Sequence, residues 1–404
     1  MLLFLAPAVN LVWRGGTGYI FFALLALALY VAARHGRVSG YFSALRKYPW
    51  FVAGMCGLLV AVIIQQISYG LWMPRQLDAY ARFALAIPIF LMLRQMPSRY
   101  FRALGWGCAA GALIVGAQAL LDRPAGGWTD GDRLGNAFTN PIPYGDTALL
   151  LAFLAVFTIG WDGKHRKWAS ILKILALVAG GFSSYCSGTR GGWLAIPLFL
   201  VMLGLQYGWF SNTKRRLISA VTVAIVISGL FATPFVEQRA HDFTADMMQF
   251  SKGDPNSSTG LRLELWRASA HLYALHPLYG VGKGKLMSAL GTLAKQGYVT
   301  GLIVNERGHS DFFSTLAELG SIGIVCLLAF YYGSAVYFWR RRSSTDAFIR
   351  SAAWAGLAVS ASTIVFGLTI DVLVPIMVTV LIALLLAAFL AAIDAREAEL
   401  ARQP

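Results

Sequence analysis

Charged residues are scarce in this chain. Only 13% of its 404 residues are Asp, Glu, Lys or Arg, about half the share typical of a soluble domain, whereas 57% are hydrophobic and the mean hydropathy is +0.61. Apolar runs long enough to cross a bilayer core of roughly 30 Å recur along the whole length. A soluble fold could not bury so many, so the composition predicts an all-α polytopic membrane protein.

Cysteine is also rare, which excludes a disulfide-based fold. The four cysteines, at positions 56, 108, 186 and 326, lie within or beside apolar segments and are interpreted as small packing residues. The first apolar run is followed directly by another and not by a small-residue cleavage site, so we expect no removable signal peptide. The chain has no evident internal repeat or low-complexity tract.

Acidic residues are few, and the 34 basic residues outnumber the 19 acidic ones to give a net charge of +15. Such a charge can indicate nucleic-acid binding. Here, however, the basic residues fall in short clusters between apolar runs, as the positive-inside rule predicts. We therefore expect membrane lipids, and not nucleic acid, as partners.

Twelve apolar segments are predicted to be membrane spans, and the first is short for a full crossing. Alternate loops carry the basic clusters, such as Arg94–Arg102 and Arg340–Arg350, so these loops are predicted to face the cytoplasm. The predicted spans lie near Leu2–Trp13, Gly18–Ala33, Trp50–Ile67, Ala81–Met96, Phe101–Leu121, Ile142–Trp161, Trp168–Ser187, Gly192–Trp209, Leu217–Phe235, Phe312–Trp339, Ala352–Leu368 and Leu373–Ile393.

Three regions follow from this pattern: residues 1–235 with nine spans, residues 236–311 as a loop outside the cytoplasm, and residues 312–404 with three spans and a cytoplasmic tail. The loop is the only long hydrophilic segment, which makes it the natural place for a functional element. Within it, Ser258-Thr259-Gly260 introduces a predicted helix, Leu261–Leu275, with one apolar face.

His309 is the strongest candidate for a catalytic residue. The triplet Gly308-His309-Ser310 stands where the polar loop meets the tenth predicted span. His309 or Ser310 is expected at the N-cap of that span, where the helix dipole and nearby arginines favour a neutral imidazole. A neutral imidazole is what a general base requires at neutral pH. A structural histidine at the membrane interface is the alternative interpretation.

Arg190 is the first candidate for binding a phosphate. It lies in Ser187-Gly188-Thr189-Arg190-Gly191-Gly192, between the seventh and eighth predicted spans and on the same side as the long loop. A phosphate arriving there would meet amide donors at a helix start, a guanidinium fork, and Gly191 and Gly192 without side chains in the way. A short turn whose arginine reaches lipid headgroups is the alternative.

Further basic candidates lie in the loop. Arg262 and Arg267 are about 140° apart on the predicted helix, so both cannot face one ligand; one is expected to bind substrate and the other to pair with Glu264 or with headgroups. Lys283 and Lys285 lie in Gly280–Lys285, which resembles a phosphate cradle. That run lacks the P-loop spacing and the preceding strand, so it is weak as a nucleotide site.

Metal sites are poorly supported. Asp130-Gly131-Asp132 has the D-x-D form that some glycosyltransferases use for a divalent ion, but the neighbouring glycines favour a flexible turn. His271 and His276 lack the HExxH spacing, and the loop contains no cysteine. We therefore expect neither a metal nor another cofactor.

The order of these motifs resembles the O-antigen ligase/polymerase superfamily. The resemblance covers roughly residues 130–330. It departs from the family at Ser310, where Asn often follows the histidine. The motifs that carry it are Asn140-Pro141-Ile142 with Gly145, Ser187–Gly191, Arg262–Trp266 with Pro277 and the following glycines, and His309 before Leu316–Gly320 and Gly323.

The resemblance implies a GT-C-like helical fold in the bacterial inner membrane, with an active site on the periplasmic face. It implies that glycan passes from undecaprenyl pyrophosphate, by a metal-independent inverting displacement, to a sugar of the lipid A–core. His309 would deprotonate the acceptor hydroxyl, while Arg190 and Arg262 would hold the pyrophosphate.

Other activities remain open at this point. An O-antigen polymerase or a protein O-oligosaccharyltransferase shares the motifs, although polymerases usually carry two substantial periplasmic loops. A transporter of lipid-linked glycans would be expected to show internal repeats or polar residues deep in several spans. The compact chain with one dominant loop favours a ligase.

Overall fold

The computed structural model describes residues 1–35, 41–129, 131–163, 166–209, 211–213, 244–252 and 254–402. The ninth predicted span, Leu217–Phe235, and Asp130 lie outside these ranges.

The helices are α1 (Leu2–Ala8), α2 (Gly16–His35), α3 (Ala44–Lys47), α4 (Pro49–Ser68), η1 (Pro74–Gln76), α5 (Asp78–Leu93), η2 (Ser98–Phe101), α6 (Arg102–Leu121), α7 (Pro141–Phe157), η3 (Thr158–Trp161), α8 (Arg166–Cys186), α9 (Arg190–Trp193), α10 (Ala195–Gln206), α13 (Ser258–Leu275), α14 (Leu286–Lys295), η5 (Gly301–Ile303), α15 (Asp311–Gly333), α16 (Ala335–Arg341), α17 (Ala347–Gly367) and α18 (Ile376–Leu400).

The all-α polytopic class is confirmed. Across the described ranges there is no strand, and eight helices are long and apolar enough to cross a membrane by length and composition. Two further predicted spans correspond to shorter apolar helices, α5 with 16 residues and the segment Arg190–Gln206 that contains α9 and α10.

The first predicted span, Leu2–Trp13, does not form a helix long enough to cross the membrane, so this prediction is wrong. Its helix α1 has seven residues and is about 10 Å long, a third of the bilayer core. The chain then turns back, and the buried Asn10 amide donates to Thr17 Oγ1 and to the Met377 carbonyl. A methyl group on Gly107 of α6 would lie 2.1 Å from the Phe4 carbonyl, so α1 packs tightly into the bundle.

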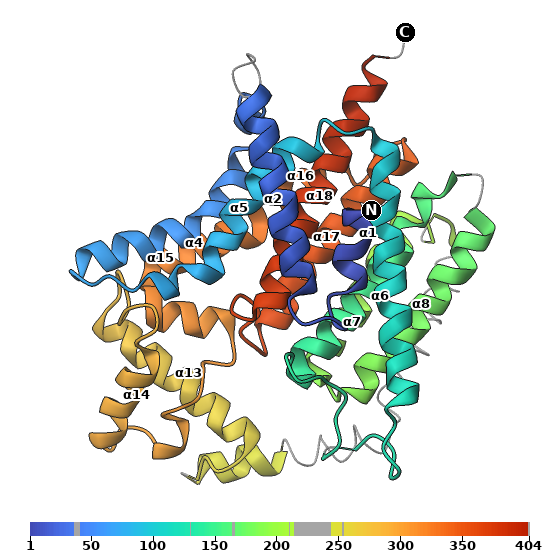
Figure 1. Cartoon of the computed structure of the whole chain (residues 1–404). Coiled ribbons are helices and arrows are strands. Elements are labelled where there is room, and N and C mark those ends of the chain that lie inside the picture. Colours follow the sequence, from blue (N-terminus) through green and yellow to red (C-terminus); the bar gives the residue numbers. More distant parts are fainter. Residues whose placement is uncertain are drawn as a thin grey trace.

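Helix α18 lies at the centre of the bundle. It is the most apolar of the candidate spans. Its most apolar 18-residue stretch has a mean hydropathy of 3.0, and 94% of that stretch is buried. It packs against α2, α5 and α17, which surround it in Figure 1. An element that is apolar all round is expected to be buried on all sides.

Three of the basic clusters converge on the C-terminal end of α18. The buried Asp394 carboxylate accepts from Lys47 Nζ at 2.7 Å, from Tyr48 Oη at 2.6 Å and from Arg94 Nε at 2.6 Å. Arg341 Nε donates to Glu397 at 2.8 Å. These contacts hold loops from distant parts of the sequence at one end of the molecule, which we call the basic end.

Helix α15 contains a break that the sequence did not predict. Gly320 has φ +61° and ψ −152°, so its backbone is not helical. The freed backbone groups pair with the segment after α13: Ser321 N donates to the Pro277 carbonyl at 2.8 Å, and Val281 N to the Ala317 carbonyl at 2.9 Å. The tenth predicted span, Phe312–Trp339, corresponds to the candidate span Asp311–Arg341 and is interrupted at Gly320.

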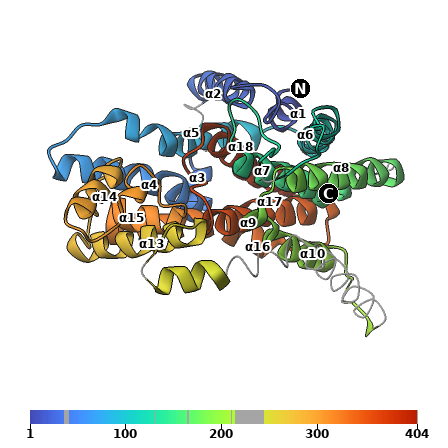
Figure 2. The ribbon, with the colours of Figure 1, turned by 90° about the horizontal axis from the view of Figure 1, so that it is seen from below.

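The described part of the loop forms a small helical unit at the other end of the bundle. Its core consists of Leu265, Ala268 and Leu272 from α13, packed against Leu286, Leu290 and Leu293 from α14. Ser257 caps α13 by accepting from Gly260 N at 3.0 Å. Figure 2 shows α13 and α14 grouped with α15 and α4 on one side of the molecule, while α8 lies on the other.

Candidate active site

His309 stands immediately before α15 in an uncommon backbone conformation. Its φ of +48° is the one positive φ of a non-glycine residue in the described ranges, and Ser310 is the N-cap, as predicted. The imidazole Nε2 lies 3.1 Å from Glu306 Oε2, and a third of the His309 side chain is exposed. If Glu306 accepts from Nε2–H, then Nδ1 keeps a lone pair that can take a proton.

Helix α13 is fixed to the His309 segment by Trp266. The indole Nε1 donates to the Gly308 carbonyl at 3.2 Å, and the ring stacks on Phe313 with centroids 4.9 Å apart. Arg262 is one helical turn before Trp266 and therefore shares its face of α13. Partial burial lowers the pKa of the Arg262 guanidinium. Arg262 is therefore a half-buried cation on the face of α13 that carries Trp266, where it can bind an anionic group.

A cavity of about 370 Å³, which we call the outer pocket, adjoins this segment. It lies at the N-terminal end of α18, because Ile376 forms part of its wall. Basic and acidic side chains face it from five separate segments. Among the residues that line it are Arg75, Asp78, Arg82, Lys283, Glu306, Arg307, Gly308, Ser314, Glu318, Asp371 and Ile376.

The charges of the outer pocket are only partly neutralised. Arg82 pairs with Asp78 and also donates to Thr379 Oγ1 at 2.9 Å. Arg75 and Arg307 are both exposed, and neither forms an ion pair with another described residue. A polar cavity with two free guanidinium groups suits a negatively charged ligand.

Arg190 begins α9, as predicted, but like His309 and Arg262 it is not among the residues that line the outer pocket. A methyl group on Gly191 would lie 2.4 Å from Thr369 Oγ1, and one on Gly192 would lie 1.9 Å from Asp146 Oδ1. These glycines therefore allow α9 to pack directly against α17 and α7. Ser310 Oγ donates to the Gly367 carbonyl at 3.2 Å, so the residues that follow Arg190 and His309 both contact the segment 367–369.

Lys283 lines the outer pocket but has a structural partner. Its Nζ pairs with Glu318 Oε2, whose second oxygen accepts from Gly284 N at 2.9 Å. Burial acts to lower the pKa of the Lys283 ammonium, but the charge of Glu318 outweighs it and the pKa is raised. Lys283 therefore stays charged and holds the loop onto α15.

Arg267 and Lys285 occupy different surroundings. The exposed Arg267 guanidinium lies 5.3 Å from the Tyr298 ring centroid, on a different face of α13 from Trp266. Glu264, the predicted arginine partner, instead accepts from Thr300 N at 2.7 Å. Lys285 is the N-cap of α14 and is not among the residues that line the outer pocket.

Sequence reasoning missed three residues of this site: Glu306, Arg307 and Arg75. Glu306 and Arg307 directly precede the Gly308-His309 pair, so their spacing was a usable signal. Arg75 lies in a short connection between α4 and α5, and no local sequence pattern indicated its place in the pocket.

Residues 174–328 match a family model described as O-antigen ligase. The match runs from α8 into α15, includes Arg190, Arg262 and His309, and supports membership of the O-antigen ligase superfamily. An uncharacterized protein of Haemophilus influenzae is 23% identical over 271 residues. That similarity covers 65% of this chain and 66% of the relative, slightly less than two thirds of the relative's length.

Proposed function

We propose that the chain is a glycosyltransferase that moves an O-antigen glycan from undecaprenyl pyrophosphate to a sugar of the lipid A–core, in the bacterial inner membrane and from its periplasmic face. One observation carries the proposal. The His309–Glu306 pair lies within the segment that matches the O-antigen ligase family, and Glu306 lines a pocket that guanidinium groups also line. The superfamily supports a lipid-linked glycan as substrate.

The residues suit an inverting displacement. His309 Nδ1 takes the proton from the acceptor hydroxyl while that oxygen forms a bond to the anomeric carbon of the donor sugar. The bond between that carbon and the pyrophosphate oxygen breaks, and its electron pair leaves with the lipid pyrophosphate. Arg190, Arg262, Arg75 and Arg307 stabilise the charge that develops on the leaving group. Glu306 orients the imidazole.

The test is a lipopolysaccharide gel from a deletion strain of the source organism. A ligase mutant loses the glycan ladder on lipid A–core and accumulates the lipid-linked polymer. A polymerase mutant instead keeps one repeat unit attached, and that result would overturn the ligase assignment. Plasmid-borne wild-type protein should restore the ladder, while a His309→Ala variant with equal expression should not.

A further inference from the structure

A second polar cavity lies at the basic end, remote from the outer pocket. Its volume is about 620 Å³, and Glu399 and Arg396 of α18 form part of its wall. Ile376 of the outer pocket and Glu399 are 23 positions apart on the same helix, so the two cavities are about 35 Å apart. That distance is close to the thickness of a bilayer core of about 30 Å.

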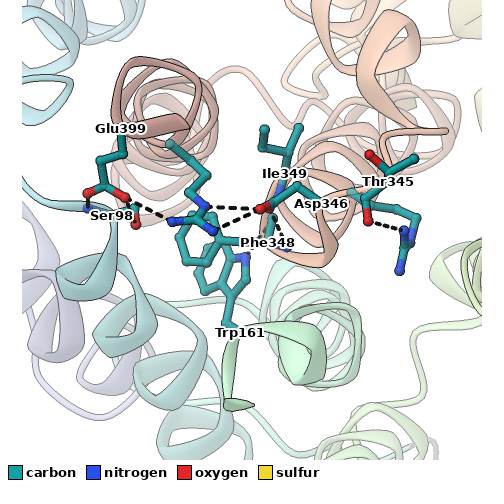
Figure 3. Close-up of polar contacts among 9 residues, drawn as sticks. Ser98, Trp161, Thr345, Asp346, Phe348, Ile349 and Glu399 are labelled. Carbon is teal, nitrogen blue, oxygen red and sulfur yellow. Dashed lines mark hydrogen bonds and ion pairs between the residues drawn. The ribbon is translucent and has the colours of Figure 1, made fainter. Parts of the chain in front are cut away.

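The two carboxylates of this basic-end cavity, Asp346 and Glu399, already accept hydrogen bonds from several protein donors. Asp346 accepts from Arg396 Nε and Nη2 at 3.0 Å each and caps α17 through Phe348 N and Ile349 N. Glu399 accepts from Ser98 N at 2.7 Å, Ser98 Oγ at 2.6 Å and Arg396 Nη1 at 3.2 Å. Figure 3 shows Glu399 and Asp346 apart from one another, each with its hydrogen bonds drawn as dashed lines.

Two arginines of the cavity are left with no carboxylate in the described part of the chain. Arg99 and Arg102 are exposed and come from η2 and the first residue of α6. Arg99 Nη2 reaches only the Tyr100 hydroxyl, at 3.3 Å. Arg396 binds both carboxylates, and the three arginines outnumber the two acidic residues, so the cavity has a net positive charge and Arg99 and Arg102 are left for a ligand.

The floor of the cavity is aromatic. Trp161 and Phe348 stack with centroids 4.8 Å apart, and Trp161 Nε1 donates to the Phe348 carbonyl at 2.9 Å, which fixes the pair (Figure 3). Trp161 is the last residue of the candidate span Pro141–Trp161, so the cavity lies level with a span end. A cavity with an apolar floor and a basic rim at this depth fits a molecule with a phosphate group and an adjoining apolar chain.

We propose that this cavity binds the headgroup of an anionic phospholipid, with the phosphate held by Arg99 and Arg102. Basic pockets between helices at the cytoplasmic surface recognise such headgroups through the same chemistry. The inference does not depend on the transfer reaction, because the cavity lies at the opposite end of α18 and shares no lining residue with the outer pocket.

The test compares lipid binding by the purified full chain in detergent. Phosphatidylglycerol, phosphatidylcholine and inorganic phosphate are titrated separately, and bound lipid is counted by native mass spectrometry. Wild type is expected to prefer phosphatidylglycerol. The Arg99→Gln/Arg102→Gln variant should lose about five-fold in affinity for each arginine, or about 30-fold together. Inorganic phosphate should not compete at millimolar concentration.

The matched control is Arg46→Gln/Arg340→Gln, which removes the same charge from two exposed arginines of the same end that do not line the cavity. It should bind phosphatidylglycerol like wild type. Equal weakening by both double variants would overturn the proposal, since it would indicate general surface attraction. Competition by inorganic phosphate would also overturn it. If the double variant does not fold, Arg102→Gln alone must still show the five-fold loss.

Discussion

At the scale of single residues, the site is built around the unusual backbone of His309. A left-handed conformation costs an L-residue roughly 1–2 kcal/mol, so it persists only where neighbouring contacts hold it. Here the preceding carbonyl is held by Trp266 and the following hydroxyl by Gly367, so both sides of the residue are fixed. This arrangement orients the imidazole before substrate arrives.

The first prediction concerns the histidine and its carboxylate. General-base catalysis typically raises the rate of a reaction by about 10²–10⁴-fold. His309→Gln keeps a hydrogen-bonding side chain but cannot take the proton at neutral pH, so glycan transfer should fall by that factor. Glu306→Gln should lower kcat by a smaller factor and leave KM nearly unchanged, because it affects only the orientation of the ring. Purified enzyme with labelled lipid-linked donor gives both constants.

Substantial turnover by His309→Gln would show that the ring only positions substrate, and Asp311 would become the better candidate for the base. Asp311 is the first residue of α15, and its carboxylate accepts from Leu373 N at 3.2 Å. A control at His276, which caps the far end of α13, should transfer glycan normally when changed to Gln.

A second prediction separates the arginines. Arg262→Ala and Arg190→Ala should abolish transfer while the protein still inserts and folds, because each removes a cation that would neutralise the pyrophosphate. Lysine should rescue poorly, since it lacks the planar fork. Arg267→Ala is the matched control from the same helix and should retain most activity, as its guanidinium lies over Tyr298. Comparable losses at all three positions would mean that charge alone matters.

Metal dependence gives a third prediction. The described residues contain no group of three or more His, Cys, Asp or Glu side chains arranged to hold a metal ion. Transfer by the purified enzyme should therefore survive incubation with EDTA. Loss of activity that magnesium or manganese restores would instead support a metal role for Asp132 and its neighbour at position 130.

Part of this site could be predicted from the sequence. His309 and Arg190 stand at helix starts, and such boundaries are visible as abrupt changes from polar to apolar residues. Arg262 follows from helical periodicity. Arg75 could not be placed in the same way, because it reaches the outer pocket only through the packing of α5 beside the loop that carries Lys283. Side chains that are about 200 positions apart in the sequence and lie near one another in the structure produce no local sequence pattern.

At the scale of elements, the break in α15 and the loop after α13 depend on each other. Gly280, Gly282 and Gly284 all have positive φ, which explains why the Gly280–Lys285 run is rich in glycine. Gly280 and Gly320 lie back to back: a methyl group on Gly320 would be 2.7 Å from Gly280 N, and one on Gly280 would be 2.5 Å from the Ala317 carbonyl. The run resembles a phosphate cradle, but it packs against a helix.

The fourth prediction tests this contact. Gly280→Ala adds a methyl group against backbone at a residue with φ +67°, so it should cost more than the roughly 1–2 kcal/mol of the conformation alone. The melting temperature of the purified protein should fall by several degrees. Gly301→Ala in the same loop is the control, because its methyl group would meet nothing within 4 Å, and its melting temperature should stay unchanged.

The helices themselves were predicted better than their interruptions. The long apolar runs predicted the bounds of α2, α4, α6, α7, α8 and α17 to within a few residues. A membrane-spanning helix must be long enough to cross the bilayer core, so it produces a long apolar stretch in the sequence. The short α1 and the break at Gly320 were missed for a shared reason. In both places backbone groups are satisfied by distant parts of the chain, Met377 for the first and Pro277 for the second.

At the scale of the whole molecule, the two cavities occupy opposite ends of α18 and differ in their surroundings. The basic end gathers Lys47, Arg94 and Arg341 around acidic residues of α18. The other end carries the helical unit of α13 and α14. Under the positive-inside rule, the first is expected in the cytoplasm and the second outside it.

The fifth prediction tests this orientation. Asn256→Cys and Ser343→Cys place exposed thiols at the two ends, in a background whose four native cysteines are changed to alanine. A membrane-impermeant maleimide added to whole cells with a permeabilised outer membrane should label position 256 and not position 343. Lysed cells should label both and serve as the control. Labelling of both positions in whole cells would refute the orientation.

The central place of α18 also constrains how the protein is made. Its packing partners α2, α5 and α17 all precede it in the chain, and α2 leaves the ribosome more than 340 residues earlier. Until α18 is synthesised, these helices lack the element that they pack against, and Lys47 and Arg94 have no Asp394 to bind. The final packing of the bundle therefore has to follow the synthesis of its core.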